Sequence, residues 1–274
     1  MEFRFDDYFF DIKDQLRDIR QLVETQRHHQ TQQIESIQQY NEHRSEKVKV
    51  IPRSQLLYNE GEAVIGRGGF GYVVKGKYSG APVAIKILSR DSTTGNDMER
   101  ELLKEAQVMQ RISHPFVVRL YGVVNERTEK CLVMELALGS LHDLLYSDRR
   151  VLQDRLMDPP DRLRQPSSDR GSKYLLGFNL ALLADSASAL DFLHSIGVLH
   201  RDIKPANVLI FQGLLCKLCD FGLSKVKDGA NSFSSTVTIG VKGTPVYMAP
   251  ERLKKVPSSK ASDVYSLGIM VGIY

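Results

Sequence analysis

The first fifty residues repeat apolar positions at the spacing of a coiled coil. They contain no glycine and no proline. Stepping by three and then four residues gives a seam that is apolar at seven of ten positions, which predicts a helix that buries one stripe. Its middle positions are glutamines, whose burial would weaken self-pairing, so a single helix packed on the following domain is the alternative. The seam consists of Phe9, Ile12, Leu16, Ile19, Val23, Gln26, Gln30, Gln33, Ile37 and Tyr40.

From residue 57 onward the pattern changes to short apolar runs separated by glycine and proline. Between two groups of such runs, residues 98–112 carry apolar side chains at a helical period. Residues 57–136 are therefore expected to form a small antiparallel sheet with one helix. The runs predict strands at residues 63–65, 72–78, 83–88, 117–124 and 131–136.

Residues 137–274 are mostly helical in pattern. Their longest apolar stretch, residues 174–196, contains Asn179, Asp185 and Asp191, and each would cost on the order of a few kcal/mol in lipid. This stretch predicts a core helix, and we expect no membrane span. Residues 147–172 hold three prolines, five aspartates and six arginines, which indicates a flexible surface insertion. The whole pattern predicts an α+β fold with two lobes, preceded by the helical or coiled-coil segment 1–50.

Composition indicates the class of protein and its compartment but does not identify a function. The 274 residues are 42% hydrophobic and 26% charged with a net charge of +4, which is typical of a globular protein and calls for no nucleic-acid partner. Three cysteines are too few for a disulfide scaffold and favour a reducing compartment. The first residues are interrupted by acids and lack the apolar core of a signal peptide. We therefore expect a cytoplasmic protein.

A glycine-rich motif follows the first predicted strand. Gly66, Gly68 and Gly71 match the pattern G-x-G-x-x-G. A dinucleotide-binding turn would open a helix, whereas this motif continues into a strand and a hairpin, so it predicts a flap whose backbone can approach phosphates. By itself the motif is as compatible with an ordinary glycine turn.

Two charged residues extend this signal. Lys86 ends the run Val-Ala-Ile-Lys on the next strand, which places an ammonium where the flap would hold phosphates. Glu105 lies on the predicted helix and could pair with Lys86 to fix its side chain. Either residue alone is as compatible with a solvated surface charge.

Three further motifs identify the family. They are Leu-His-Arg-Asp-Ile-Lys-Pro-Ala-Asn-Val-Leu at residues 199–209, Asp-Phe-Gly at 220–222 and Ala-Pro-Glu at 249–251. Asp202 is followed by Asn207 after five positions and by Asp220 after eighteen. With this order and spacing, the chain from about residue 57 resembles the eukaryotic protein kinase family, which implies ATP and Mg²⁺ as cofactors and protein substrates.

The resemblance implies a role for each matching residue. Asp202 would accept or orient the proton of the substrate hydroxyl, and Lys204 would contact the γ-phosphate. Asn207 and Asp220 would hold magnesium. In the same scheme Lys86 binds the α- and β-phosphates and Glu105 positions Lys86, while His200 is structural. The implied nucleotide-binding residues are Ile65, Gly66, Gly68, Gly71, Val73, Ala84, Lys86, Met134, Glu135, Ala137 and Leu209, with Met134 as gatekeeper and Glu135 and Ala137 acting through their backbone.

The motifs also favour a subgroup. Lys204 and Gly243-Thr244-Pro245 are similar to those of serine/threonine kinases, while residues 132–136, 139–141 and 262–268 resemble the tyrosine-kinase-like group, which includes receptor-interacting, mixed-lineage and leucine-rich-repeat kinases. The chain is therefore expected to be a serine/threonine kinase in signal transduction. A tyrosine kinase, and a non-catalytic adaptor that acts through residues 1–50, are the alternatives.

Three more expectations concern the activation segment, two of the cysteines and the extent of the second lobe. Arg201 is the kind of residue that binds a phosphorylated activation segment, and residues 232–238 offer several hydroxyl acceptors. Cys216 and Cys219 form a C-x-x-C pattern that could indicate a zinc or redox site. Positions three apart on a strand face opposite sides, however, so we expect the two cysteines to be packing residues. The resemblance also implies further helices after residue 274, so we expect a truncated second lobe in which Glu251 lacks its arginine partner.

Overall fold

The structure is a computed structural model in which residues 47–274 form one compact unit. The coiled-coil prediction for residues 1–50 falls almost entirely outside the described residues and stays a prediction. The same holds for most of the predicted insertion 147–172 and for the candidate phosphorylation segment 232–238. The structure describes residues 48–59, 64–68, 71–88, 95–126, 129–146, 170–226 and 243–272.

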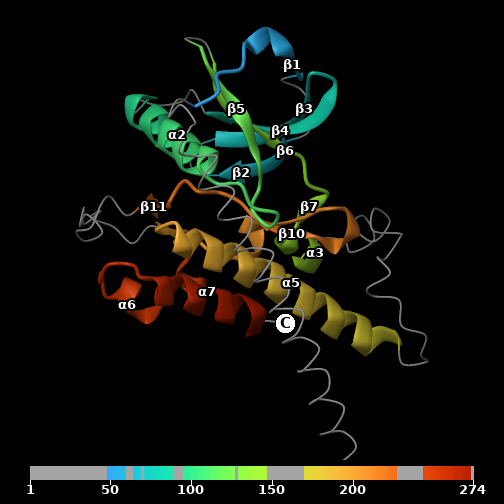
Figure 1. The fold of residues 1–274 in the computed structure, drawn as a ribbon, viewed down its shortest axis with the longest axis vertical. Coiled ribbons are helices and arrows are strands. Elements are labelled where there is room, and N and C mark those ends of the chain that lie inside the picture. The colour runs from blue at the N-terminus through green and yellow to red at the C-terminus, as the bar shows by residue number, and fades with distance from the viewer. Residues whose placement is uncertain are drawn as a thin grey trace, which may run out of the picture. The chain divides into compact units, whose positions relative to one another are not determined.

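An antiparallel sheet of six strands forms the upper part of this unit (Figure 1). Its main order is β1-β3-β4-β6-β5, and β2 pairs with β3. The predicted strands are present, although the run predicted from residue 117 enters the sheet only at residue 120. The backbone of residues 116–118 pairs instead with Leu218 of the lower part. The strands are β1 (Leu56–Leu57), β2 (Val64–Gly68), β3 (Gly71–Tyr78), β4 (Ala81–Leu88), β5 (Leu120–Asn125) and β6 (Lys130–Glu135).

The two faces of the sheet carry different side chains, because successive side chains along a strand point to opposite faces. On β4, Val83, Ile85 and Ile87 are buried in an outer hydrophobic cluster. Ala84 and Lys86 lie on the opposite face. The alternation therefore places the only charged residue of β4 on the face that the helix covers.

Residues 48–57 belong to this outer cluster. Ile51 and Leu56 are both 1% exposed and pack in it. The backbone of residues 49–51 lies along β5, with Val123 donating to the Lys49 carbonyl at 2.9 Å and Ile51 donating to the Val123 carbonyl at 2.7 Å. The core of the sheet thus includes a segment that precedes residue 57, where the domain was predicted to begin.

Helix α2 (Gly95–Gln110) covers the other face of the sheet (Figure 1). Leu102, Ala106 and Met109 are buried on one side of it, at the spacing of three and four residues that puts side chains on one helix face. Glu105 occupies the same stripe and is 4% exposed. The helical period therefore carries this carboxylate into the interior beside the sheet.

The lower part is mainly helical and holds three short β-pairings. Helices α5 and α7 pack against each other (Figure 1). The polar Asp185 is tolerated in the predicted core helix because it accepts a hydrogen bond from the Cys216 amide at 3.0 Å. The elements are β7 (Gly139–Ser140), α3 (Leu141–Tyr146), α5 (Arg170–Ser195), β8 (Val198–Leu199), β9 (Val208–Ile210), β10 (Cys216–Leu218), β11 (Lys225–Val226), α6 (Pro250–Leu253) and α7 (Lys260–Gly272), with short 3-10 turns at Pro205–Asn207, Gln212–Leu214 and Pro245–Tyr247. A further 3-10 turn, Arg53–Gln55, precedes β1 in the upper part.

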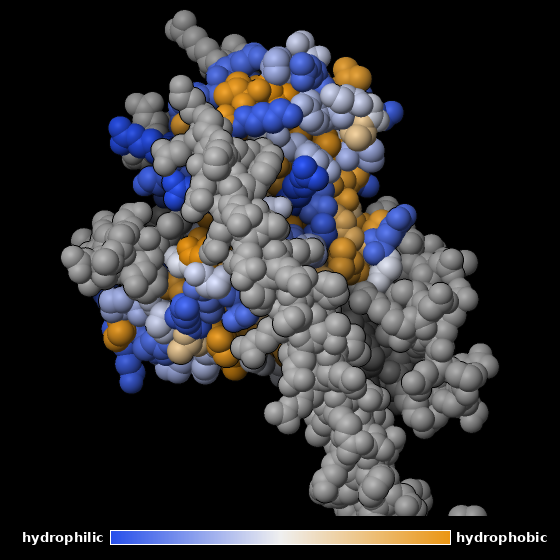
Figure 2. Space-filling view, viewed as in Figure 1, coloured by the Kyte–Doolittle hydropathy of each residue, from blue (hydrophilic) through white to orange (hydrophobic). Residues whose placement is uncertain are grey.

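The predicted α+β fold with two lobes is therefore confirmed. The lobes are joined by backbone hydrogen bonds from Val118 to the Leu218 carbonyl and from Leu138 to the Ile210 carbonyl, both 2.9 Å. On the face shown in Figure 2, hydrophobic residues form separate patches among hydrophilic ones. In the parts of the chain that the structure describes, no helix has the length and apolar character needed to cross a bilayer.

Candidate active site

The glycine-rich hairpin lies directly beside Lys86. Strand pairing joins Gly66 to Val73, Val73 to Lys86, and Lys86 to Leu132, so these positions form one row across the sheet. Paired residues of antiparallel strands share a face, which places the flap and the ammonium together. At Gly71 a Cβ atom would lie 1.9 Å from the Ile87 carbonyl oxygen, so this position accepts only glycine.

Lys86 joins the helix to the second lobe. Its Nζ donates to both carboxylate oxygens of Glu105 at 2.9 and 2.8 Å and to Oδ1 of Asp220 at 3.0 Å. The Lys86 side chain is 13% exposed and that of Glu105 3%. The ammonium is thus desolvated and held by two carboxylates from distant parts of the chain.

This arrangement shifts the pKa values of two partners in opposite directions. Burial acts to lower the pKa of Lys86, but the attraction of Glu105 and then of Asp220 outweighs it, and the pKa is raised. Partial desolvation acts to raise the pKa of Asp220, but the Lys86 ammonium outweighs it and lowers that pKa. Both groups therefore stay charged near neutral pH.

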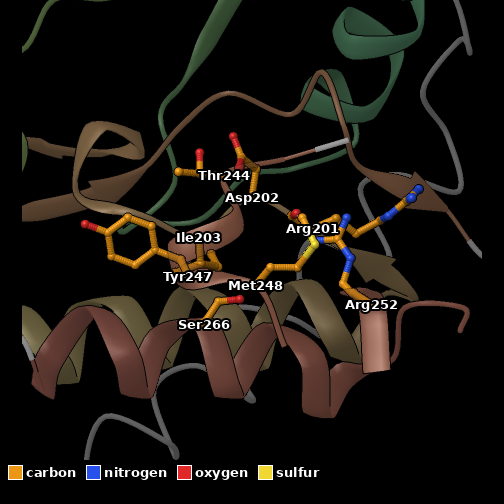
Figure 3. A pocket seen from close by; sticks show the side chains of 8 residues that line it. All are labelled: Arg201, Asp202, Ile203, Thr244, Tyr247, Met248, Arg252 and Ser266. Carbon is orange, nitrogen blue, oxygen red and sulfur yellow. The ribbon is translucent and has the colours of Figure 1, made fainter. Parts of the chain in front are cut away.

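A second cluster surrounds Asp202. This residue is 9% exposed. Its Oδ2 forms an ion pair with Lys204 Nζ at 2.7 Å and accepts a hydrogen bond from Asn207 Nδ2 at 3.0 Å. Lys204 also donates to Thr244 Oγ1 at 3.0 Å. The side chains of Asp202 and Thr244 lie close together on one side of a small pocket, with Arg201 and Arg252 on another side (Figure 3).

Asp263 of α7 binds the backbone of the loop that carries Asp202. Its carboxylate accepts hydrogen bonds from His194 Nε2 at 3.0 Å and from the amides of His200 and Arg201 at 2.9 and 2.8 Å. Burial acts to raise the pKa of Asp263, but the bond from His194 and the other donors outweigh it and lower the pKa. Arg201 and Asp220 both adopt positive φ, at 71° and 63°, a strained conformation that such fixed loops maintain at functional sites.

His200 packs in the interior, in agreement with the structural role expected for it. The residue is fully buried, and its ring lies 5.1 Å from the ring of Phe221. Its Nε2 lies 3.0 Å from the carbonyl oxygen of Cys219. The imidazole therefore links the loop that carries Asp202 to the strand end that carries Asp220.

The residues predicted to hold magnesium fit that ion chemically. Asp220 offers a carboxylate whose side chain is 42% exposed. Asn207 uses its Nδ2 to donate to the backbone carbonyl and the carboxylate of Asp202, so its amide oxygen is left as an acceptor. Carboxylate and amide oxygens, completed by phosphate and water, are the ligands that Mg²⁺ prefers.

The residues predicted for the adenine lie where the two lobes meet. Ala84 pairs with Met134 across β4 and β6, and Leu209 of β9 pairs with Ser140 of β7 in the lower lobe. Ala137 lies between these strands. Ile65 is 41% exposed at the open edge of the hairpin. These positions are compatible with a slot between the lobes.

Sequence reasoning missed two contacts of the site. The expected role of Glu135 involved only its backbone, yet its carboxylate binds Lys217 of β10 at 2.7 Å. The Arg201 carbonyl accepts a 2.6 Å hydrogen bond from Arg252. Lys217 lies three residues before Asp220, and its two neighbours on β10 are buried. The alternation of apolar and charged residues on this strand is the one sequence signal that Lys217 points to the opposite face from its neighbours.

The structure also describes the surroundings of Glu251 and of the two cysteines near Asp220. The Glu251 carboxylate accepts a 2.6 Å hydrogen bond from Ser262 Oγ, which lowers its pKa, and the expected lack of its arginine partner stays a prediction. Cys216 and Cys219 are free thiols, and Cys216 is buried as expected. Among the described residues no cluster of three metal-ligating side chains occurs.

Comparison with known proteins agrees with this geometry. The family model described as "Protein kinase domain" matches residues 58–273. Similar curated proteins include the serine/threonine-protein kinases TIO and CTR1 of Arabidopsis thaliana, 32% identical over 210 residues and 34% over 212. Each match covers 76% of this chain, which spans 14% of TIO and 22% of CTR1. The dual specificity protein kinase shkB of Dictyostelium discoideum is 34% identical over 224 residues, which are 81% of this chain and 30% of shkB. With the family model matching most of its length, the chain belongs to the protein kinase domain family.

Proposed function

We propose that the chain is an ATP-dependent protein kinase that transfers the γ-phosphate of ATP to serine or threonine hydroxyls of proteins. The observation that carries this proposal is the position of Asp202, held between Lys204 and Asn207 at 2.7 and 3.0 Å. A carboxylate in this setting can accept or orient a hydroxyl proton, while an ammonium beside it can stabilise phosphate charge.

Phosphoryl transfer places most of its demand on positioning and electrostatics. We assign to Lys86 the binding of the α- and β-phosphates, and to Glu105 the positioning of Lys86. Lys204, shared between Asp202 and Thr244, would contact the γ-phosphate. Because Lys86 remains an ammonium, it supplies this charge without any change of protonation.

Asp220 and Asn207 are the residues that would hold magnesium. The ion supplies positive charge that offsets the charge on the transferred phosphate. In the structure Lys86 lies 3.0 Å from Asp220 Oδ1, so the same contact also brings the proposed phosphate-binding residue beside the proposed metal ligand. Gly66, Gly68 and Gly71 would cover the phosphates, because a backbone without side chains can approach them closely.

The acceptor class is supported by the sequence around Thr244 and by the names of the relatives. Thr244 receives a hydrogen bond from Lys204 and belongs to the Gly-Thr-Pro motif that is similar to serine/threonine kinases. TIO and CTR1 carry that designation in their names. The relative shkB is called a dual specificity kinase, so phosphotyrosine needs to be measured alongside.

The test is transfer of labelled γ-phosphate from magnesium-ATP to the chain and to a basic protein, followed by phosphoamino-acid analysis. Asp202→Asn is expected to abolish transfer. Asp191→Asn is the matched control, because Asp191 is an exposed aspartate of α5, and it is expected to retain full activity. Absence of transfer by a folded wild-type chain would contradict the proposal, and phosphotyrosine alone would correct the acceptor class.

We also propose that residues 1–50 mediate self-association or binding of a partner helix, and that the protein works in the cytoplasm. The heptad seam supports the first part, and the three cysteines support the second. Light scattering on the full chain and on a variant with Leu16→Asp and Val23→Asp tests association, since both residues lie in the seam. A monomeric mass for the wild type would contradict self-association, and the same oligomeric mass for both proteins would contradict the role of the seam.

A further inference from the structure

An ion pair behind the predicted adenine slot joins the two lobes. Lys217 Nζ donates to both carboxylate oxygens of Glu135, at 2.8 and 2.7 Å. Glu135 is the last residue of β6 in the upper lobe, and Lys217 is the middle residue of β10 in the lower lobe. The pair therefore spans the connection about which the lobes would move relative to each other.

Each partner is fixed by further contacts within its own lobe. Glu135 Oε1 also accepts a hydrogen bond from the Arg119 amide at 2.7 Å, and the Glu135 amide donates to the Arg119 carbonyl at 3.1 Å. The Lys217 ammonium lies 4.7 Å from the ring centroid of Phe211, a distance at which a cation and an aromatic ring attract. Each end of the pair is thus also held by contacts other than the ion pair.

Burial distinguishes this pair from an ordinary surface ion pair. The side chains of Lys217 and Glu135 are 14% and 16% exposed. Exposed pairs contribute little, because water screens them. A largely desolvated pair with additional hydrogen bonds is stronger, and removing one partner leaves the other charge buried without compensation.

The two residues also adjoin the proposed chemistry. Lys217 is three positions before Asp220, on the strand that delivers this carboxylate to Lys86. Glu135 directly follows Met134, and Met134 pairs with Ala84 beside the predicted adenine position. A change in the distance between Glu135 and Lys217 would shift the adenine slot relative to the residues that hold the phosphates and the metal.

We propose that Lys217 is a positioning residue for the nucleotide site, acting through the carboxylate of Glu135 to keep the two lobes at the separation that fits ATP. This inference rests on the proposed kinase function. It assigns Lys217 no contact with the nucleotide, since the residue works only through its partner. A preformed slot binds more tightly because less order has to be imposed on binding.

The first test compares the wild type with Lys217→Met and Lys217→Arg in the full chain. We expect Lys217→Met to raise KM for magnesium-ATP about fivefold with less than about twofold change in kcat, a size typical of coupled neighbours. Lys217→Arg keeps the charge and is expected to restore KM to within about twofold of the wild type. Lys104→Met, which removes an exposed lysine of α2, is the control and is expected to leave both constants unchanged.

The pair itself is tested with Glu135→Gln and the double variant Glu135→Gln/Lys217→Met. If the two residues act as a unit, the double variant has a KM close to that of each single variant and well below the product of their effects. Independent effects that multiply in the double variant would overturn the proposal. So would an unchanged KM for ATP in Lys217→Met.

Hydrogen exchange without nucleotide separates this inference from the kinase assignment. The amides of Glu135 and Leu138 donate to Arg119 and Ile210, respectively, and both bonds lie next to the ion pair. Lys217→Met is expected to speed exchange at these two amides and to leave exchange in α5 unchanged. If the wild type transfers no phosphate, the kinase proposal fails, and the exchange rates still decide whether the ion pair holds the lobes. Unchanged exchange at both amides would overturn the inference even in an active enzyme.

Discussion

Lys86 Nζ lies 3.0 Å from Asp220 Oδ1 while both carboxylate oxygens of Glu105 hold the same ammonium. One side chain of β4 therefore joins α2 to the second lobe. This contact needs the helix and the strand end that carries Asp220 to be in place together. It is the arrangement from which the first prediction follows.

Removing the ammonium should abolish most of the activity. Lys86→Met leaves Glu105 buried and Asp220 without its cationic partner, so we expect kcat to fall at least about 100-fold. The melting temperature should also fall, because Glu105 loses the charge that compensates its burial. Lys104→Met is the matched control on the exposed side of α2, and steady-state kinetics should show near wild-type values for it. A Lys86→Met enzyme with wild-type kcat would remove Lys86 from the phosphate site.

Asp263 should be important for stability as well as for activity. Asp263→Asn keeps the size of the side chain but replaces one acceptor oxygen by an NH₂ group, which then faces either the Arg201 amide at Oδ1 or the donors of His194 and His200 at Oδ2. We expect a loss of about 2–4 kcal/mol in the free energy of unfolding, measured by urea denaturation. A loss below about 0.5 kcal/mol, the usual size for a surface substitution, would show that the stability of the loop that carries Asp202 does not depend on this carboxylate.

The segment before residue 57 should stabilise the upper lobe. Ile51→Ala creates a cavity in the outer cluster and is expected to cost about 2–4 kcal/mol. Val50→Ala, one residue earlier and 63% exposed, is expected to cost less than about 0.5 kcal/mol. Urea denaturation of both variants makes the comparison. Equal effects would mean that residues 48–51 do not pack on the sheet in solution.

His114 should make the protein less stable in mild acid. Burial lowers its pKa to about 4 from the ordinary value of 6.5, and its Nε2 is buried without a hydrogen-bond partner among the described residues. Between pH 6.5 and about 4 the unfolded chain binds a proton that the folded chain excludes. The contribution of His114 to stability therefore falls as the pH falls through this window, and it is independent of pH above it.

The variant His114→Phe tests this sign. Its ring can keep the stacking on Phe192, at 4.7 Å between ring centroids in the wild type, but cannot take up a proton. We expect its free energy of unfolding to decline less than that of the wild type between pH 7 and pH 4.5, although paired carboxylates such as Asp263 still add acid sensitivity. His142→Phe replaces an exposed histidine and should follow the wild type. Parallel curves for wild type and His114→Phe would contradict the assignment.

Much of the fold and of the candidate site was accessible from the sequence. Alternation along β4 separates Lys86 from Ile85 and Ile87, and the helical period of α2 puts Glu105 in the buried stripe with Leu102 and Ala106. Both are local properties, because strand and helix periods fix which side chains share a face. The spacing from Asp202 to Asn207 works in the same way, since a short loop brings them within hydrogen-bond distance.

Contacts between distant segments were decided by the tertiary structure alone. The pairing of residues 116–118 with Leu218, which moves the start of β5 to residue 120, joins positions about a hundred residues apart. Packing of Ile51 into the outer cluster and the bond of Lys217 to Glu135 are of the same kind. Periodicity shows which face a residue occupies, whereas its partner depends on how the elements dock. The sequence by itself therefore determined the elements, the family resemblance and the candidate chemistry, and docking of the lobes decided how the site is held together.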